Sequence, residues 1–91
     1  MQKGYYGITY RGQIKIVCDI LKTIMKRGQA KQTTIMCDAN LSYLMIKKYL
    51  KLLEEYNFII HDKKENMWYS SEQGVRFYDL LNKKKGESFG T

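Results

Sequence analysis

The sequence predicts a mainly α-helical domain with one β-hairpin, in the order helix, helix, helix, strand, strand, helix. Residues 13–27 and 42–56 repeat apolar side chains at helical spacing. Between residues 58 and 70, two short β-rich runs flank a polar loop of hairpin length. Another amphipathic segment follows, and a short arm precedes the first helix. These observations predict an α+β domain whose hairpin lies between the third and fourth helices.

The composition limits the classes of protein to which the chain can belong. Its 91 residues are enough for one domain with a modest core, and 44% hydrophobic residues are too many for a disordered chain. No apolar run approaches the roughly 20 residues that span a bilayer, and the start does not resemble a signal peptide. We therefore expect a cytoplasmic protein without a membrane partner. The net charge of +7 favours a polyanionic partner such as nucleic acid.

The first twelve residues, Met1–Gly12, contain three glycines and show no helical period. Tyr6, Ile8 and Tyr10 alternate as one face of a short strand would. We predict an arm or an edge strand packed on the domain. A dimer contact and a DNA-contacting arm are the alternatives.

The first helix is predicted over Gln13–Arg27, with apolar residues on one face and charged residues on the other. Gly28 follows its last turn, where glycine commonly ends a helix. We expect this helix to act as scaffold. Its apolar stripe consists of Ile14, Val17, Cys18, Ile20, Leu21, Ile24 and Met25.

A short second helix (residues 31–39) and a longer third helix (residues 42–56) are joined by a tight turn, as in a helix-turn-helix. Asn40 tolerates the left-handed conformation that such turns need, and Asn57 could take it after the third helix. Ser42 is a good N-cap for the third helix. That helix has an apolar face made of Ile46, Tyr49, Leu50 and Leu53, and a basic face made of Lys47, Lys48 and Lys51.

The hairpin is predicted from strands Phe58–Asp62 and Met67–Ser70. With one apolar and one basic face, the third helix is expected to be the recognition helix of a DNA-binding domain, and a hairpin directly after such a helix is a wing. Lys63 and Lys64 at its tip would meet phosphates or a minor groove. The alternative is a solvated loop with incidental lysines, because Asp62 and Glu65 balance their charge.

Ser71 is predicted to cap a last helix that runs to about Lys84. Gly74 in its first turn costs helix stability, which predicts close packing at that position. We expect residues 13–85 to form the domain and residues 86–91 to be a frayed tail. The apolar residues of this helix are Phe77, Tyr78, Leu80 and Leu81.

This order of elements is that of a winged helix-turn-helix, and the segment Thr33–Ile59 resembles small archaeal winged-helix regulators. Those proteins carry the signature T-x-I-M-x-x-A-x-L-S-Y, followed by Y-L-x-x-L-x-x-x-G-L-I and a T-E-K-G block. The resemblance covers about Arg11 to Leu81. The matching residues are Thr33, Ile35, Met36, Ala39, Leu41, Ser42, Tyr43, Tyr49, Leu50, Leu53 and Ile59, and the segment from Trp68 to Gly74 is similar to the last block.

The resemblance implies an archaeal DNA-binding protein, often dimeric, of a family that includes chromatin-type proteins with antiparallel coiled coils. No heptads follow Leu81, so a long coiled coil is not expected here. Asn57 stands where glycine is usual, and Thr34 where a basic residue is common. We expect a homodimer formed through the last helix, at Phe77, Tyr78 and Leu81, or through the arm.

The expected function is regulation of transcription by binding double-stranded DNA at the nucleoid, with the third helix in the major groove and the wing (residues 62–67) on the backbone or minor groove. The alternatives are a non-specific architectural DNA-binding protein and a winged-helix module that binds protein. Met45 is either an apolar DNA contact or part of the core. The predicted DNA-binding residues are Gln32, Thr33, Thr34, Ser42, Tyr43, Lys47, Lys48, Lys51, Lys63 and Lys64.

No enzyme, metal site or cofactor is predicted. His61, Cys18 and Cys37 are scattered without metal-ligand spacing, and no glycine-rich phosphate loop is present. We expect the two cysteines to be buried thiols rather than a disulfide.

Overall fold

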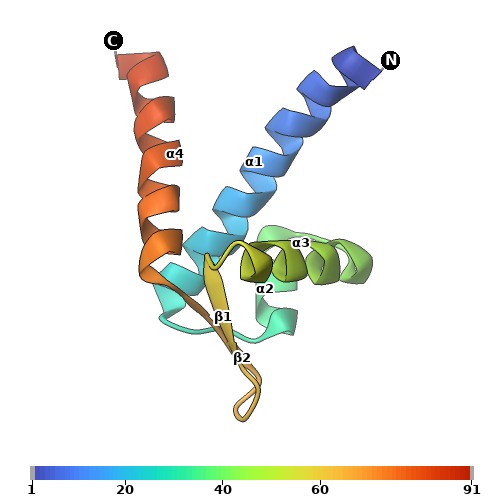
Figure 1. Cartoon of the computed structure of the whole chain (residues 1–91), viewed down its shortest axis with the longest axis vertical. Coiled ribbons are helices and arrows are strands. Elements are labelled where there is room, and N and C mark those ends of the chain that lie inside the picture. The colour runs from blue at the N-terminus through green and yellow to red at the C-terminus, as the bar shows by residue number, and fades with distance from the viewer. Residues whose placement is uncertain (1, 91) are drawn as a thin grey trace.

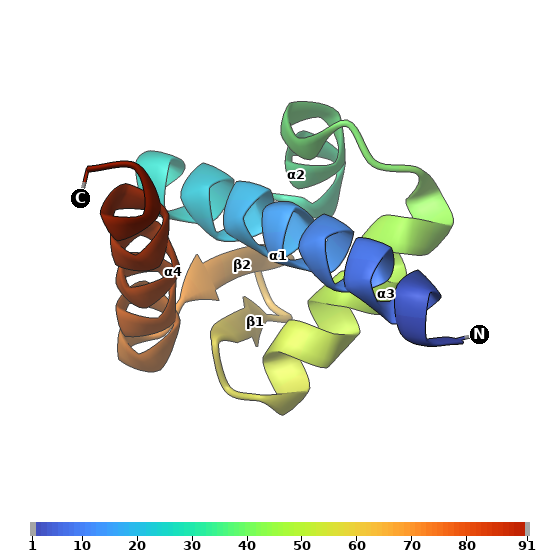
Figure 2. The same cartoon turned by 90° about the horizontal axis from the view of Figure 1, so that it is seen from above.

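The computed structural model describes the backbone of residues 2–90 and the side chains of residues 12–82. The elements in chain order are α1 (Gln2–Arg27), α2 (Gln32–Ala39), α3 (Tyr43–Glu55), β1 (Ile59–Asp62), β2 (Met67–Ser70) and α4 (Glu72–Gly90). The strands pair in one antiparallel hairpin, so the predicted order and fold class are confirmed. Figure 1 shows this hairpin projecting away from the end of the molecule where α1 begins and α4 ends. Seen from above, α1 crosses the middle of the molecule, with α2 on one side and α3 on the other (Figure 2).

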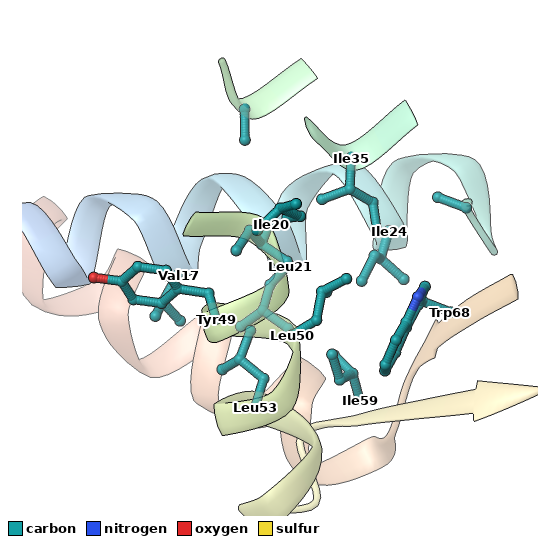
Figure 3. Close-up of a cluster of buried hydrophobic side chains, with 13 residues drawn as sticks. Val17, Ile20, Leu21, Ile24, Ile35, Tyr49, Leu50, Leu53, Ile59 and Trp68 are labelled. Carbon is teal, nitrogen blue, oxygen red and sulfur yellow. The ribbon is translucent and has the colours of Figure 1, made fainter. Parts of the chain in front are cut away.

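The core lies where α1, α3 and the hairpin meet (Figure 3). Apolar residues at i, i+3 and i+4 put one stripe of each helix into this space. Burying one such large side chain contributes about 1.5–3 kcal/mol, so the cluster is the main source of stability. Its members are Val17, Ile20, Leu21, Ile24, Ala30, Ile35, Ala39, Ile46, Tyr49, Leu50, Leu53, Ile59 and Trp68.

Helices α2 and α3 are each followed by an asparagine in the left-handed conformation. Asn40 follows α2 with φ 55°, and Asn57 follows α3 with φ 65°. After α3, the Phe58 N–H donates to the Leu53 carbonyl and the Asn57 N–H to the Glu54 carbonyl, both at 2.9 Å. This is the pattern of a Schellman motif, which satisfies carbonyls that the helix itself leaves open. Both predicted left-handed turns are therefore confirmed.

The hairpin is held to the helices by Ala30, between α1 and α2. The Ala30 N–H donates to the Trp68 carbonyl (3.0 Å), and the Trp68 N–H donates to the Ala30 carbonyl (2.8 Å). The Trp68 side chain is buried and stacks on His61, its partner across the hairpin, at a centroid distance of 4.2 Å. The base of the hairpin is thus part of the core, although its tip is not.

Helix α4 begins at a close contact with the segment that follows α3. The Ser71 hydroxyl accepts from the Gly74 N–H (3.0 Å) and donates to the Asn57 carbonyl (2.6 Å). A methyl group at Gly74 would overlap the Phe58 carbonyl oxygen. Both the Ser71 cap and the close packing at Gly74 were predicted, and both are confirmed.

The first twelve residues were predicted to be an arm or edge strand and residues 86–91 a frayed tail, and both predictions are wrong about the conformation. Residues 2–12 continue α1 back to Gln2, and α4 continues through the predicted tail to Gly90. Glycines lower helix propensity, but extending an existing helix adds a hydrogen bond for each residue fixed and avoids the cost of nucleation. The strand-like alternation of Tyr6, Ile8 and Tyr10 concerns side chains outside the described residues.

The prediction for the cysteines holds for only one of them. Cys18 is buried, whereas Cys37 is exposed, and no disulfide joins them. The short helix α2 buries Ile35 and Ala39, which lie one turn apart. Cys37, two residues from Ile35, therefore falls on the opposite face of the helix.

Replacing Gly74 by alanine is expected to lower the free energy of unfolding by about 1–3 kcal/mol, because the new methyl group meets backbone that cannot rotate away. Gly12→Ala is the control. Gly12 lies inside α1 with open space around its Cα, so alanine there should raise stability by roughly 0.5–1 kcal/mol. Urea unfolding measures both. A neutral Gly74→Ala would contradict the close contact, and a neutral Gly12→Ala would contradict the extended helix.

Candidate nucleic-acid interface

Helix α3 has one face in the core and the opposite face in solvent. Ile46, Tyr49, Leu50 and Leu53 are buried. At 3.6 residues per turn, the outward face is then formed by residues near Leu44, Lys48 and Lys51. All three of these side chains are exposed. The predicted division into an apolar and a basic face is confirmed for this helix.

The lysines of the outward face are not neutralised by the protein itself. Within residues 12–82, the ion pairs are Lys15–Asp19, Arg27–Asp38 and Arg76–Glu72. None of them involves α3 or the hairpin. Lys47, Lys48 and Lys51 therefore leave positive charge on the outward face of α3, which suits a phosphate backbone, whereas Asp62 and Glu65 balance the two lysines at the hairpin tip. The exposed lysines in question are Lys47, Lys48, Lys51, Lys63 and Lys64.

The first turn of α3 is fixed by Ser42. The Ser42 hydroxyl accepts from the Met45 N–H at 3.2 Å, which confirms the predicted N-cap. One turn later, the Lys47 ammonium lies 5.3 Å from the ring centroid of Tyr43, a cation–π distance. Ser42 and Tyr43 therefore lie beside the lysine face, as expected for DNA contacts, although the Ser42 hydroxyl is already engaged in the cap.

Of the three α2 residues that were predicted to contact DNA, only one is exposed. Thr33 is exposed, whereas Gln32 and Thr34 are half-buried. Thr34 lies in a depression that is also lined by Arg27, Lys31 and Met67, the first residue of β2. Of these, Lys31 is an exposed cation that the predicted site did not include.

The hairpin tip has a defined backbone. The Asp62 carboxylate accepts from the N–H groups of Lys64 (3.0 Å) and Glu65 (3.3 Å). Asn66 takes φ 57°, and its side-chain oxygen lies 3.0 Å from Nε2 of His61. These contacts organise a tight four-residue turn on which both Lys63 and Lys64 are exposed. The predicted strands and loop are confirmed, but the contact of the two lysines with DNA stays a prediction.

Sequence reasoning missed Leu44. Its side chain is 77% exposed, the highest value among the exposed large hydrophobic residues between positions 12 and 82. The apolar spacing of α3 already excludes it from the core, because it lies on the line of Lys48 and Lys51. Met45, for which the sequence allows either a core position or an apolar DNA contact, is 37% exposed.

Other kinds of site are not formed by the described residues. Among them, no three His, Cys, Asp or Glu side chains are grouped as a metal site would require. None of the helices in the described part has both the length and the apolar character needed to cross a membrane.

Comparison with known families agrees with this architecture. A family model described as winged helix-turn-helix matches residues 10–88, nearly the whole chain. The chain belongs to the winged helix-turn-helix family. No curated protein matches the sequence. Membership of this family suggests DNA binding, and winged-helix DNA-binding domains are typically not enzymes.

In DNA-binding winged helices, the second helix of the helix-turn-helix unit is the recognition helix, and α3 occupies that position in this chain. The substitution Ser42→Ala is expected to remove its N-cap and to lower the free energy of unfolding by about 1 kcal/mol. Ser42→Asp should keep the wild-type stability, because aspartate caps equally well and its charge suits a helix N-terminus. Urea unfolding compares the variants, and an unchanged midpoint for Ser42→Ala would contradict the capping role.

Proposed function

We propose that this winged helix is a DNA-binding transcriptional regulator. Helix α3 would enter the major groove of double-stranded DNA, and the hairpin would lie on the backbone or in the minor groove as a wing. The signature residues between Thr33 and Tyr43 support an archaeal regulator that acts at the nucleoid. The observation that carries the proposal is the outward face of α3, where Lys47, Lys48 and Lys51 follow the exposed first turn and have no ion-pair partner among residues 12–82.

Electrostatics support nucleic acid as the partner. Each phosphate that a lysine contacts releases a condensed counterion, so unpaired lysines contribute directly to affinity. In contrast, a protein partner without matching acids would have to desolvate these charges at a cost. The lysines of α3 follow the exposed first turn, which leaves that turn to meet base edges while later turns meet the backbone.

The wing and α2 would hold α3 in register. Lys63 and Lys64 would anchor the hairpin tip to phosphates, and Thr33, with Gln32 and Thr34 beside it, would contact backbone. Recognition would be modest, because no arginine is present on α3 to make the bidentate contact with guanine.

A homodimer is part of this proposal. The residues expected at its interface (Phe77, Tyr78 and Leu81) are half-buried and pack against the core, and Phe77 stacks on Phe58 at 4.4 Å. They leave a mainly apolar groove of about 320 Å³ between α1, α3 and α4. A second copy of the chain packed on this groove would remove its apolar lining from water. The groove residues include Ile14, Val17, Leu52, Tyr56, Phe77 and Leu81.

Sedimentation velocity tests the dimer. Tyr56 is 61% exposed on the groove, so Tyr56→Lys should shift a wild-type dimer towards monomer. Ile60→Lys is the matched control, because Ile60 is similarly exposed (54%) but lies on the hairpin. A monomeric wild type, or equal effects of the two variants, would rule out this interface.

A salt-titrated gel shift tests DNA binding. If the wild type neutralises roughly five phosphates, log K should fall with log[salt] at a slope near −4 to −5. Replacing Lys47, Lys48 and Lys51 by glutamine should make that slope shallower by about 2 to 3. The control removes the same charge from α1, by glutamine at Lys15, Lys22 and Lys26, and should change the slope little. Equal effects of the two triple variants would contradict binding through α3.

The same assay separates the candidate functions. A regulator should prefer duplex DNA from upstream of its own gene over random duplex by about a thousandfold or more. Equal, steeply salt-dependent affinity for both would instead indicate an architectural protein. No binding to either duplex at low salt would reject DNA as the partner.

A further inference from the structure

The first turn of α3 carries an apolar patch on an otherwise basic surface. Tyr43 is 58%, Leu44 77% and Met45 37% exposed. Single exposed hydrophobic residues are common and need no explanation. Three large ones in succession, at the N-terminal turn of a recognition helix, form a surface that favours a partner with an apolar feature.

The patch is centred on the face that would meet DNA. Leu44, Lys48 and Lys51 follow one another at i, i+4 and i+7, so they lie along one line of the helix surface. Tyr43 and Met45 flank Leu44 on either side of this line. The buried residues of α3 lie on the opposite side. Leu44 is therefore placed ahead of the lysines on the same stripe.

The edges of the bases offer only one apolar group in the major groove, the C5-methyl group of thymine. The first turn contains no arginine, asparagine or glutamine for bidentate hydrogen bonds to guanine or adenine. The Ser42 hydroxyl accepts from the Met45 N–H, so it has its single O–H left to donate and cannot make a bidentate contact. We propose that Leu44, flanked by Tyr43 and Met45, contacts thymine methyl groups, so that this winged helix prefers thymine-rich duplex DNA. This inference rests on the proposed function.

The surrounding charge favours DNA over a hydrophobic protein groove as the occupant of the patch. Lys47, Lys48 and Lys51 lie within two turns of Leu44 and have no ion-pair partner among residues 12–82. Burying the patch in an apolar protein groove would desolvate these ammonium groups, whereas the major groove brings phosphates alongside them.

Replacing thymine by uracil in the DNA removes only the methyl group and keeps every phosphate and base pair. The full chain is titrated at low salt with alternating dA–dT duplex and with alternating dA–dU duplex of equal length. We expect tighter binding to the thymine duplex, by about threefold to fourfold for each methyl group that the patch covers. A dG–dC duplex methylated at cytosine C5 should likewise bind more tightly than its unmethylated form.

Two variants assign the effect to residues. Leu44→Ala should bring the ratio of the thymine-duplex and uracil-duplex affinities closer to one, whereas Lys47→Gln should weaken both and keep their ratio. Equal wild-type affinity for the two duplexes, with Lys47→Gln still weaker, would overturn the methyl contact and leave the proposed function standing. A Leu44→Ala variant that keeps the thymine preference would overturn the assignment to Leu44. Failure to bind any duplex would overturn both proposals.

Discussion

The burial of one face of α3 against α1 and the hairpin is the constraint on which the rest of the surface depends. Ile46 and Leu50 are almost fully buried, and a helix is too rigid to rotate single residues independently. Once these side chains are in the core, Leu44, Lys48 and Lys51 must face solvent. The composition of the candidate interface is therefore decided by the packing of the core, and a change in that packing would turn the lysines away from a partner.

Charge and apolar contact have separate roles in the proposed complex. The lysines of α3 and the wing supply an attraction to phosphate that is independent of sequence and sensitive to salt. Discrimination between sequences needs contacts to base edges, for which α3 offers mainly Tyr43, Leu44 and Met45. Lys15, on the scaffold helix, has a different status because Asp19 already pairs with it. The lysines of α3 therefore lie next to the apolar side chains of its first turn, and they are not paired as Lys15 is.

Local signals in the sequence were enough to predict most of the fold. Periodic apolar residues predicted the helical faces, and Asn40 and Asn57 predicted left-handed turns because asparagine tolerates them. The helical course of residues 2–12 could not be predicted, because their glycines lower the local helix propensity. Extension of an existing helix overcomes this, since it avoids the cost of nucleation. For the candidate site, the lysines were predicted from their charge, whereas Leu44 was missed because an exposed leucine is not by itself a sign of a binding site. The DNA contacts themselves remain predictions.

An NMR titration of the full chain with duplex DNA tests most directly whether α3 and the wing form the binding surface. Backbone amide shifts should change most in residues 42–51 and 63–66, and the changes should fade as salt is raised. Amides on the exposed side of α1, around Lys15 and Lys22, should change little. Changes concentrated along the groove between α1 and α4, with α3 unaffected, would contradict DNA binding through α3 and the wing.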